Sequence, residues 1–456
     1  MFNVSLMASL RNLPLVSELG LSALFFFTVV GIGFLIPAAL VSAELATGWP
    51  KSGGIYIWVR EAFGDKWGFF AIWMQWIHNV TWFPAILSFV AATLAYIFNP
   101  ELASSKIFIL CVVLSVFWGM TLFNYLGIKL SSLFSTVGVI AGTIIPGLLI
   151  IFLGISWVAS NQPSFLTISW DAFIPDLGDP QNLVFMGGLF LAFAGLEVSA
   201  AYAGEVKDPQ KNYPRAIIIA ALITFFLFML GSLSIAVVIP KSEISLVSGL
   251  MEAFQLFLVN YNLAWFVPIL AMLLVFGAVA EVNSWIIGPV KALYTTSLHG
   301  NLPPIFQKQN RHNMPVNLLL FQAIIVTIAA CVILFMPSIS AAYWILTALS
   351  AQLYLVMYLT MFAAAIKLRY SKPHVPRAYK IPHPHKGMWI VACVGMFASI
   401  FAITLSFLPP SQLAVGNLLF YELFLLIGFG CMIALPFVMH AFRKPEWMKK
   451  IHDSAS

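Results

Sequence analysis

Eleven apolar runs of about 20 residues or more constrain this chain more than any other feature. An α-helix rises 1.5 Å per residue, so ~20 apolar residues cross the ~30 Å hydrocarbon core of a bilayer. Only 9% of the residues are charged, whereas a soluble domain is about 25% charged. The chain is therefore predicted to be one all-α polytopic membrane domain, which excludes soluble enzymes, nucleic-acid binders and disordered proteins. The runs lie at 21–44, 67–97, 106–125, 130–158, 183–204, 214–240, 264–290, 315–336, 340–366, 388–408 and 415–440.

Two shorter apolar segments need a separate interpretation. Residues 246–260 contain Glu252 and are predicted to form an interfacial or re-entrant helix. Residues 1–10 are too few to span, and Pro14 disfavours helical backbone at the residue before it. Counted as half of a broken first helix, they raise the predicted number of transmembrane helices to about twelve. A further hypothesis is that Met1 is not the native start and that part of this helix lies upstream.

Lysine and arginine residues are distributed unevenly between the predicted loops. Of the 23, 20 fall on the loops of one side, Lys106 and Lys241 fall on the other, and Arg11 lies within a span. Because cytoplasmic loops carry an excess of Lys and Arg, this split predicts that both termini are cytoplasmic. The acidic loop 159–182 then lies on the outer face.

The four cysteines show no CxxC spacing, and each stands alone in an apolar run. They are predicted to be buried free thiols, neither disulfides nor metal ligands. The four are Cys111, Cys331, Cys393 and Cys431.

Ionisable residues within a span cost roughly 2.5–3.5 kcal/mol each on insertion scales, so the few that occur are informative. Glu18, Glu44 and Glu205 lie near span ends, where contact with water is the simplest explanation. Glu422 is predicted to be peripheral, and His78 to be a packing residue rather than a proton relay. The full set is Arg11, Glu18, Glu44, His78, Glu197, Glu205, Glu281 and Glu422.

Glu197 lies in a stretch of small residues, and two interpretations of this stretch are open. Small residues allow close helix packing, whereas Gly195 also allows local unwinding and a second broken helix. Breaks at corresponding places in the two halves of a chain point to an inverted-repeat transporter. Freed N–H groups at a half-helix suit a carboxylate and freed carbonyls suit an ammonium, and an amino acid carries both.

Two later spans carry further polar candidates. Glu281 and Trp285 are four residues apart and share one helix face. Glu281 is a candidate protonation site, and a structural hydrogen bond to a neighbouring helix is the alternative. Gln352 precedes Tyr354 and Tyr358, which also share a face, and packing is their alternative role.

Six segments carry a resemblance to a known family. They are LRNLPL with the following GLSALFFF, AELATGWPKSGGIYIWVREAFG, GLEVSAAYAGEVKDPQKNYPRA, SIAVVIPKSEISLVSGLMEAF, GAVAEVNSWIIGPVKALY and ITLSFLPP. On these segments the chain resembles the amino acid–polyamine–organocation superfamily, and most closely its glutamate/γ-aminobutyrate antiporter branch. The glycines after Pro50 are characteristic of the superfamily, and the segment around Glu281 is characteristic of the branch.

The resemblance implies a five-plus-five inverted repeat, at about 1–158 and 183–366, with two appended helices within 388–440 and a short cytoplasmic tail at 441–456. It implies a substrate site between broken helices 1 and 6, lined by helices 3, 8 and 10, and transport by alternating access. Proton coupling or gating is assigned to Glu281 and Glu197. The predicted substrate-binding residues are Arg11, Asn12, Ala194, Gly195, Glu197, Ser199, Trp285, Tyr354 and Tyr358.

Three departures from the family bear on substrate and coupling. Arg11 and Asn12 stand where the acid-resistance antiporters have an acidic and aromatic pair, and Thr136 stands where many relatives place a lysine. The tail leaves little length for a regulatory plug. We hypothesise that Arg11 favours a substrate with an extra carboxylate, such as glutamate, or holds Glu197 or Glu281 in the empty site. Snorkelling or capping at the break is its alternative role.

The predicted function is secondary transport in a bacterial inner membrane, exchanging glutamate or a related amino acid for γ-aminobutyrate or another amino acid. A proton-coupled symporter of neutral or cationic amino acids is the alternative within transport, and a transporter-like sensor is the alternative outside it. The motifs HEXXH and GxxxxGK[ST] are absent from the sequence, so an enzyme and an ATP-driven pump are not expected. No cofactor or nucleic-acid partner is expected, protons are a candidate partner, and the oligomeric state is left open.

Overall fold

A computed structural model describes residues 4, 7–51, 53–178, 183–198, 208–383, 385–410 and 415–448. Within these ranges the regular structure is helical, and β-pairing is limited to two isolated bridges, His299 with Met448 and Gln309 with Pro315. The α-helices are α2 (Asn12–Ser17), α3 (Ala23–Val30), α4 (Ile36–Gly48), α5 (Ile55–Phe63), α6 (Asp65–Phe98), α7 (Lys106–Asn124), α8 (Ile128–Val139), α9 (Ile145–Ala159), α10 (Trp170–Phe173), α11 (Met186–Ala192), α12 (Pro209–Val238), α13 (Gly249–Asn260), α14 (Val267–Leu298), α15 (Val316–Ala330), α16 (Val332–Phe335), α17 (Ile339–Ser371), α18 (Lys386–Leu405) and α19 (Leu418–Ala441).

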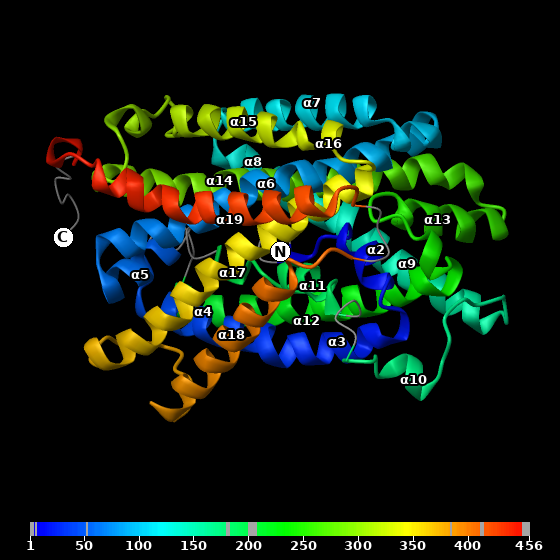
Figure 1. Ribbon diagram of the computed structural model, residues 1–456, viewed down its shortest axis with the longest axis horizontal. Helices are drawn as coiled ribbons and strands as arrows, with labels where there is room; N and C mark the ends of the chain where they lie inside the picture. The colour runs from blue at the N-terminus through cyan, green and yellow to red at the C-terminus, as the bar shows by residue number, and fades with distance from the viewer. Residues whose placement is uncertain are drawn as a thin grey trace.

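Ten helical segments in the described part of the chain are long and apolar enough to cross a membrane. They coincide with ten of the eleven predicted runs. Helices such as α7, α14, α15 and α19 lie along the long axis of the molecule, and α17 and α18 run obliquely to it (Figure 1). The eleventh run contains the shorter apolar segment Met186–Val198. The segments are Gly20–Gly48, Asp65–Phe98, Lys106–Asn124, Leu133–Ala159, Pro214–Val238, Ala264–Leu298, Val316–Phe335, Ile339–Ser371, Lys386–Leu405 and Leu418–Ala441. The predicted non-spanning helix is α13, whose 12 residues are too few to cross a bilayer.

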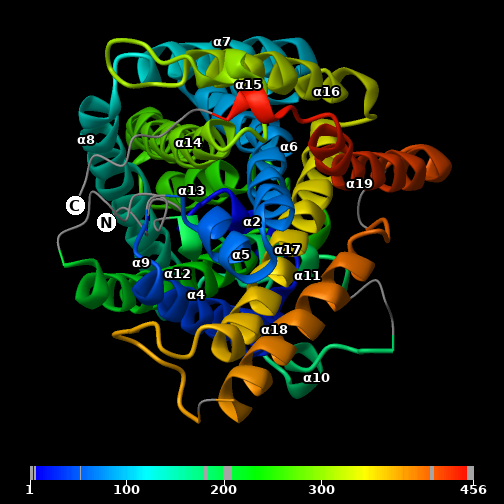
Figure 2. The same cartoon turned by 90° about the vertical axis from the view of Figure 1, so that its left-hand side faces the viewer.

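Helices α6 and α17 form the interior of the bundle. The most apolar part of α6 is 89% buried and that of α17 is 72% buried, against 11% for α19. Viewed along the helices, α6 and α17 lie inside, and α7, α15 and α19 lie at the periphery (Figure 2). Polar side chains on α6 and α17 can therefore be placed away from lipid, at little of the cost that a lipid-facing polar group would carry.

The first transmembrane segment is interrupted. Met7 is helical, residues 8–9 are not, and α2 begins at Asn12. Leu13, where Pro14 was expected to disfavour helical backbone, is helical, and Pro14 lies in the first turn of α2. A proline costs little there because the N–H that it lacks has no partner within the first turn of a helix.

The eleventh predicted run is interrupted as well. Helix α11 ends at Ala192, and the chain turns through Phe193–Gly195 before another helical turn over residues 196–198. Gly195 has a φ of +113°, a conformation that glycine adopts without strain. The described chain therefore has a break here, not a continuous packing helix. Residues 199–207 lie outside the described residues.

Two predictions about span-end residues are wrong. Glu44 is 1% exposed and Glu18 is 3% exposed, so neither reaches water at an interface. Glu44 instead pairs with Arg369 and Arg377, which lie more than 300 residues further along the chain. Glu422 is exposed, as predicted. Glu205 lies outside the described residues.

The cysteines are free, but they are not buried as predicted. Three of them are exposed on the surface of the molecule and Cys331 is half-buried. They lie in segments that are long and apolar enough to cross a membrane, where the surface of a helix faces lipid and not water.

Candidate functional site

Glu197 lies just past the break that follows α11 and is 2% exposed. Two tyrosines of α17 donate to its carboxylate, Tyr354 to Oε1 and Tyr358 to Oε2. Gln75 of α6 donates to Oε1 at 3.0 Å. The peptide N–H of Gly195 donates to the Tyr358 hydroxyl at 2.9 Å, so one tyrosine holds both the break and the carboxylate. Buried carboxylates need such donors. Glu197, Gln75, Tyr354 and Tyr358 are termed the glutamate cluster.

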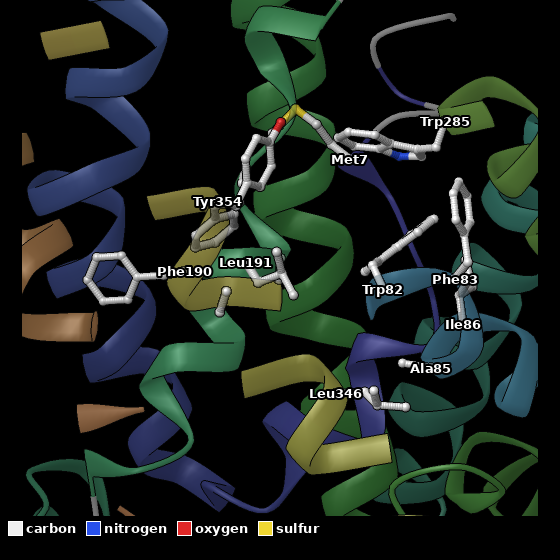
Figure 3. Close-up of a cluster of buried hydrophobic side chains, with 14 of the residues drawn as sticks. Met7, Trp82, Phe83, Ala85, Ile86, Phe190, Leu191, Trp285, Leu346 and Tyr354 are labelled. Atoms are coloured by element: carbon white, nitrogen blue, oxygen red, sulfur yellow. The ribbon is translucent and has the colours of Figure 1, made fainter. Parts of the chain in front are cut away.

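Two aromatic rings lie against the glutamate cluster. The imidazole of His78 stacks on Tyr354, with 3.8 Å between the ring centroids and 10° between the ring planes. The ring centroid of Trp285 lies 5.5 Å from that of His78 and 6.0 Å from that of Tyr354. Figure 3 shows Trp285 and Tyr354 in one buried cluster with Met7 and Trp82. Polar contacts in such a water-poor environment are stronger than contacts at a surface.

A second cluster surrounds Arg11, which is 2% exposed and precedes α2. Its Nη1 donates to the Tyr343 hydroxyl at 2.8 Å, and its guanidinium carbon lies 5.3 Å from the ring centroid of Trp82. Glu281 of α14 interacts electrostatically with Arg11 and is hydrogen-bonded to Ser9. Arg11, Ser9, Trp82, Glu281 and Tyr343 are termed the arginine cluster.

The two clusters meet at Trp285. This residue lies one helical turn after Glu281, and its indole is 5.6 Å from Trp82 of the arginine cluster. Of the two carboxylates hypothesised to hold Arg11 in the empty site, Glu197 accepts hydrogen bonds from tyrosines, and Glu281 interacts electrostatically with Arg11. The indole of Trp285 thus contacts both the cluster of the Glu197 carboxylate and the cluster of the Arg11 guanidinium.

The other predicted site residues lie at the two breaks. Asn12 is buried at the start of α2, and its N–H donates to the Ser9 carbonyl at 3.1 Å. Ala194 is buried within the second break, and its N–H donates to the Leu191 carbonyl at 3.2 Å. Ser199 lies outside the described residues.

Thr136, which stands where many relatives place a lysine, lies in α8. Its neighbour Ser135 donates to the Ala280 carbonyl at 3.1 Å and accepts from Asn283 at 2.9 Å. Next to Thr136, α8 and α14 are therefore joined by hydrogen bonds between uncharged groups, whereas a lysine at position 136 would place a charge there.

Sequence reasoning did not select several residues that the structure brings to these clusters. Gln75, His78 and Trp82 recur every three or four residues and so share one face of α6. Tyr343 shares a face of α17 with Tyr354 and Tyr358 for the same reason. That spacing is the signal that could have found them. In the part of the chain that the structure describes, no group of three or more His, Cys, Asp and Glu residues lies close enough to hold a metal ion.

Ten bilayer-length segments, two interrupted segments and a buried polar site at both interruptions define a multi-pass membrane transporter. A model of the amino acid permease family matches residues 1–429. The chain belongs to the amino acid permease family. It is therefore an integral membrane permease and not an enzyme.

Three proteins of similar sequence are also transporters. An uncharacterized transporter of Legionella pneumophila is 42% identical over 438 residues, which cover 96% of this chain and 94% of that protein. A glutamate/gamma-aminobutyrate antiporter of Lactococcus lactis is 32% identical over 456 residues, covering 99% and 90%. A probable agmatine/putrescine antiporter of the same species is 25% identical over 400 residues, covering 86% and 83%. These relatives indicate a small amino acid or polyamine as the class of substrate.

Proposed function

We propose that the chain exchanges glutamate or a related amino acid for γ-aminobutyrate or another amino acid. The observation that carries the proposal is that a buried carboxylate, Glu197, and a buried guanidinium, Arg11, lie beside the breaks of the two interrupted helices, in clusters that meet at Trp285. The full-length similarity to the glutamate/gamma-aminobutyrate antiporter supports these substrates.

An amino acid matches the charges of the two clusters. Its ammonium binds near Glu197, whose carboxylate is held in place by two tyrosines. Its carboxylate binds Arg11, whose Nε has no hydrogen-bond partner among the described residues. A guanidinium binds a carboxylate with two parallel hydrogen bonds. Asn12, Ala194, Gly195 and Ser199, which lie in the sequence at the two breaks, are proposed to complete the site.

Glu281 is proposed to couple or gate transport. It interacts electrostatically with Arg11, so a substrate carboxylate that binds Arg11 competes with it for the guanidinium. Protonation of Glu281 then releases Arg11 for the substrate, because a neutral carboxyl attracts a guanidinium less than a carboxylate does.

The two breaks support alternating access through an inverted repeat, at about 1–158 and 183–366, with appended helices within 388–440 and a tail at 441–456. The loop charges support cytoplasmic termini in a bacterial inner membrane. Three basic residues of the loops assigned to the cytoplasm form ion pairs at one end of the bundle: Arg60 and Lys372 with Glu61, and Arg443 with Asp65.

Uptake of labelled glutamate into proteoliposomes tests the proposal. The vesicles are preloaded with glutamate, with γ-aminobutyrate or with nothing, and protein-free vesicles are the control. Stimulation by either internal amino acid is expected. Uptake into empty vesicles driven by an imposed proton gradient would favour the symporter instead, and binding without flux would favour the sensor.

Arg11→Met tests the role of the guanidinium. It keeps an unbranched apolar stem but removes the guanidinium and its charge, so exchange of glutamate is expected to fall by about tenfold or more, as for a lost charge-assisted hydrogen bond. Arg311→Met removes an exposed arginine from a loop and is the matched control. Unchanged glutamate exchange by Arg11→Met would remove Arg11 from the site.

A further inference from the structure

His78 lies beside the glutamate cluster, but the exchange proposed above gives it no role. It is 1% exposed and shares a face of α6 with Gln75. Its ring stacks on Tyr354, and the hydroxyl of Tyr354 donates to Glu197. One tyrosine, Tyr354, therefore contacts both the imidazole and the proposed ammonium-binding carboxylate.

The hydrogen bonds of Ser350 determine which nitrogen of His78 carries the proton. The Ser350 hydroxyl donates its single hydrogen to the backbone carbonyl of His78 at 2.9 Å. It can then only accept from Nδ1 of the ring, which lies 3.4 Å away. In the neutral imidazole one nitrogen donates and the other accepts. Nδ1 is therefore the donor, and Nε2 is left as an acceptor.

Nε2 of His78 is buried and has no hydrogen-bond partner among the described residues. Nε2 is the ring nitrogen farther from the α6 backbone. The ring that carries it stacks on Tyr354 and meets Trp285 edge-on. A buried acceptor without a donor is unfavourable. Nε2 can therefore accept a hydrogen bond from a donor group of a bound ligand.

We infer that His78 is a substrate-binding residue whose Nε2 accepts a hydrogen bond from the ammonium of the transported amino acid. The inference rests on the proposed function and deepens it. Glu197 supplies the charge that attracts the ammonium, and His78 supplies a second acceptor at a fixed position on the Tyr354 ring. Together they select substrates that carry an ammonium against dicarboxylates of similar length that lack one.

Two substitutions separate this role from packing. His78→Phe keeps a flat ring against Tyr354 and removes the acceptor, whereas His78→Gln loses the ring and keeps an acceptor at a similar distance from the backbone. Exchange of labelled glutamate is measured in proteoliposomes at increasing external glutamate. Competition by glutarate, which has no ammonium, is measured with the same vesicles.

His78→Phe is expected to raise the half-saturating glutamate concentration by about 10- to 100-fold, the loss expected for one hydrogen bond to a charged group. Glutarate competition should change by less than about threefold, because glutarate does not use the acceptor. His78→Gln should restore much of the lost affinity. A packing role predicts the opposite order, with Phe tolerated better than Gln.

The inference is overturned if His78→Phe matches the parent protein, if it weakens glutarate as much as glutamate, or if His78→Gln is the worse variant. These outcomes leave the proposed function intact, which fails only if the parent protein shows no exchange. If His78→Phe does not fold, Ser350→Ala replaces it. That variant frees Nδ1 and lets the proton move to Nε2, so unchanged glutamate affinity in Ser350→Ala would also overturn the inference.

Discussion

At the scale of single residues, the Tyr358 hydroxyl links the Glu197 carboxylate to the backbone of the second break. It donates to Glu197 and accepts from the Gly195 N–H, so it fixes the carboxylate relative to the break. Tyr358→Phe removes both bonds and keeps the ring, which packs edge-on against Phe34. The half-saturating glutamate concentration for exchange should rise about 10- to 100-fold.

Tyr421→Phe is the control for this prediction. It removes a buried hydroxyl that accepts from Trp344 and should leave exchange unchanged. Equal effects of the two variants would contradict this role.

Glu44 illustrates a residue whose role is in stability. It accepts from Nε and Nη2 of Arg369 at 2.5 Å and from the Ile381 N–H at 2.9 Å, and it lies 3.6 Å from Nε of Arg377. Glu44→Gln leaves two largely buried arginines without their counter-charge, so the free energy of unfolding should fall by about 3–5 kcal/mol. Unfolding of the purified protein in increasing denaturing detergent measures this change. Glu422→Gln, at an exposed position, should change it little, and a similar small change for Glu44→Gln would refute the prediction.

At the scale of elements, α14 is held in place by direct backbone contact. A π-helical turn over Ile140–Ile144 joins α8 to α9, and a Cβ built on Gly142 would lie 2.4 Å from the Gly277 Cα. A Cβ on Gly277 would lie 2.5 Å from the Gly142 carbonyl. Small residues allow such close approach of helices in membranes. The position of α14 matters because it carries Glu281 and Trp285 into the two clusters.

Gly277→Ala should therefore separate α14 from the π-helical turn. The expected loss is about 1–3 kcal/mol of unfolding free energy, as for other overpacked sites. It should appear as a lower melting temperature of the detergent-purified protein. Gly119→Ala is the matched control, because a Cβ at that position of α7 meets nothing within 4 Å. If both alanines shift the melting temperature equally, backbone contact does not hold α14 in place.

At the scale of the whole molecule, the spans could be predicted because length and apolarity decide them. The short first run indicated one break, and Gly195 left the second break as one of two open interpretations. Tyr354 with Tyr358, and Glu281 with Trp285, could be paired because helical spacing places them on one face. Spacing places His78 on one face of α6 with Gln75 and Trp82, but its place beside Tyr354 could not be predicted, because a span that is apolar all round does not show which face points inward. The burial of Glu44 could not be predicted either, since its partner Arg369 is 325 residues away along the chain.

The orientation of the molecule is a whole-chain property that one labelling experiment can test. The loop charges predict that Lys241 lies outside and Lys380 inside the cell, and both side chains are exposed. Lys241→Cys and Lys380→Cys are introduced separately into a variant whose four native cysteines are replaced by alanine. In intact cells a membrane-impermeant maleimide should label only Lys241→Cys, and permeabilised cells should label both. Labelling of Lys380→Cys alone in intact cells would show the inverted topology and would contradict the orientation that the loop charges predict.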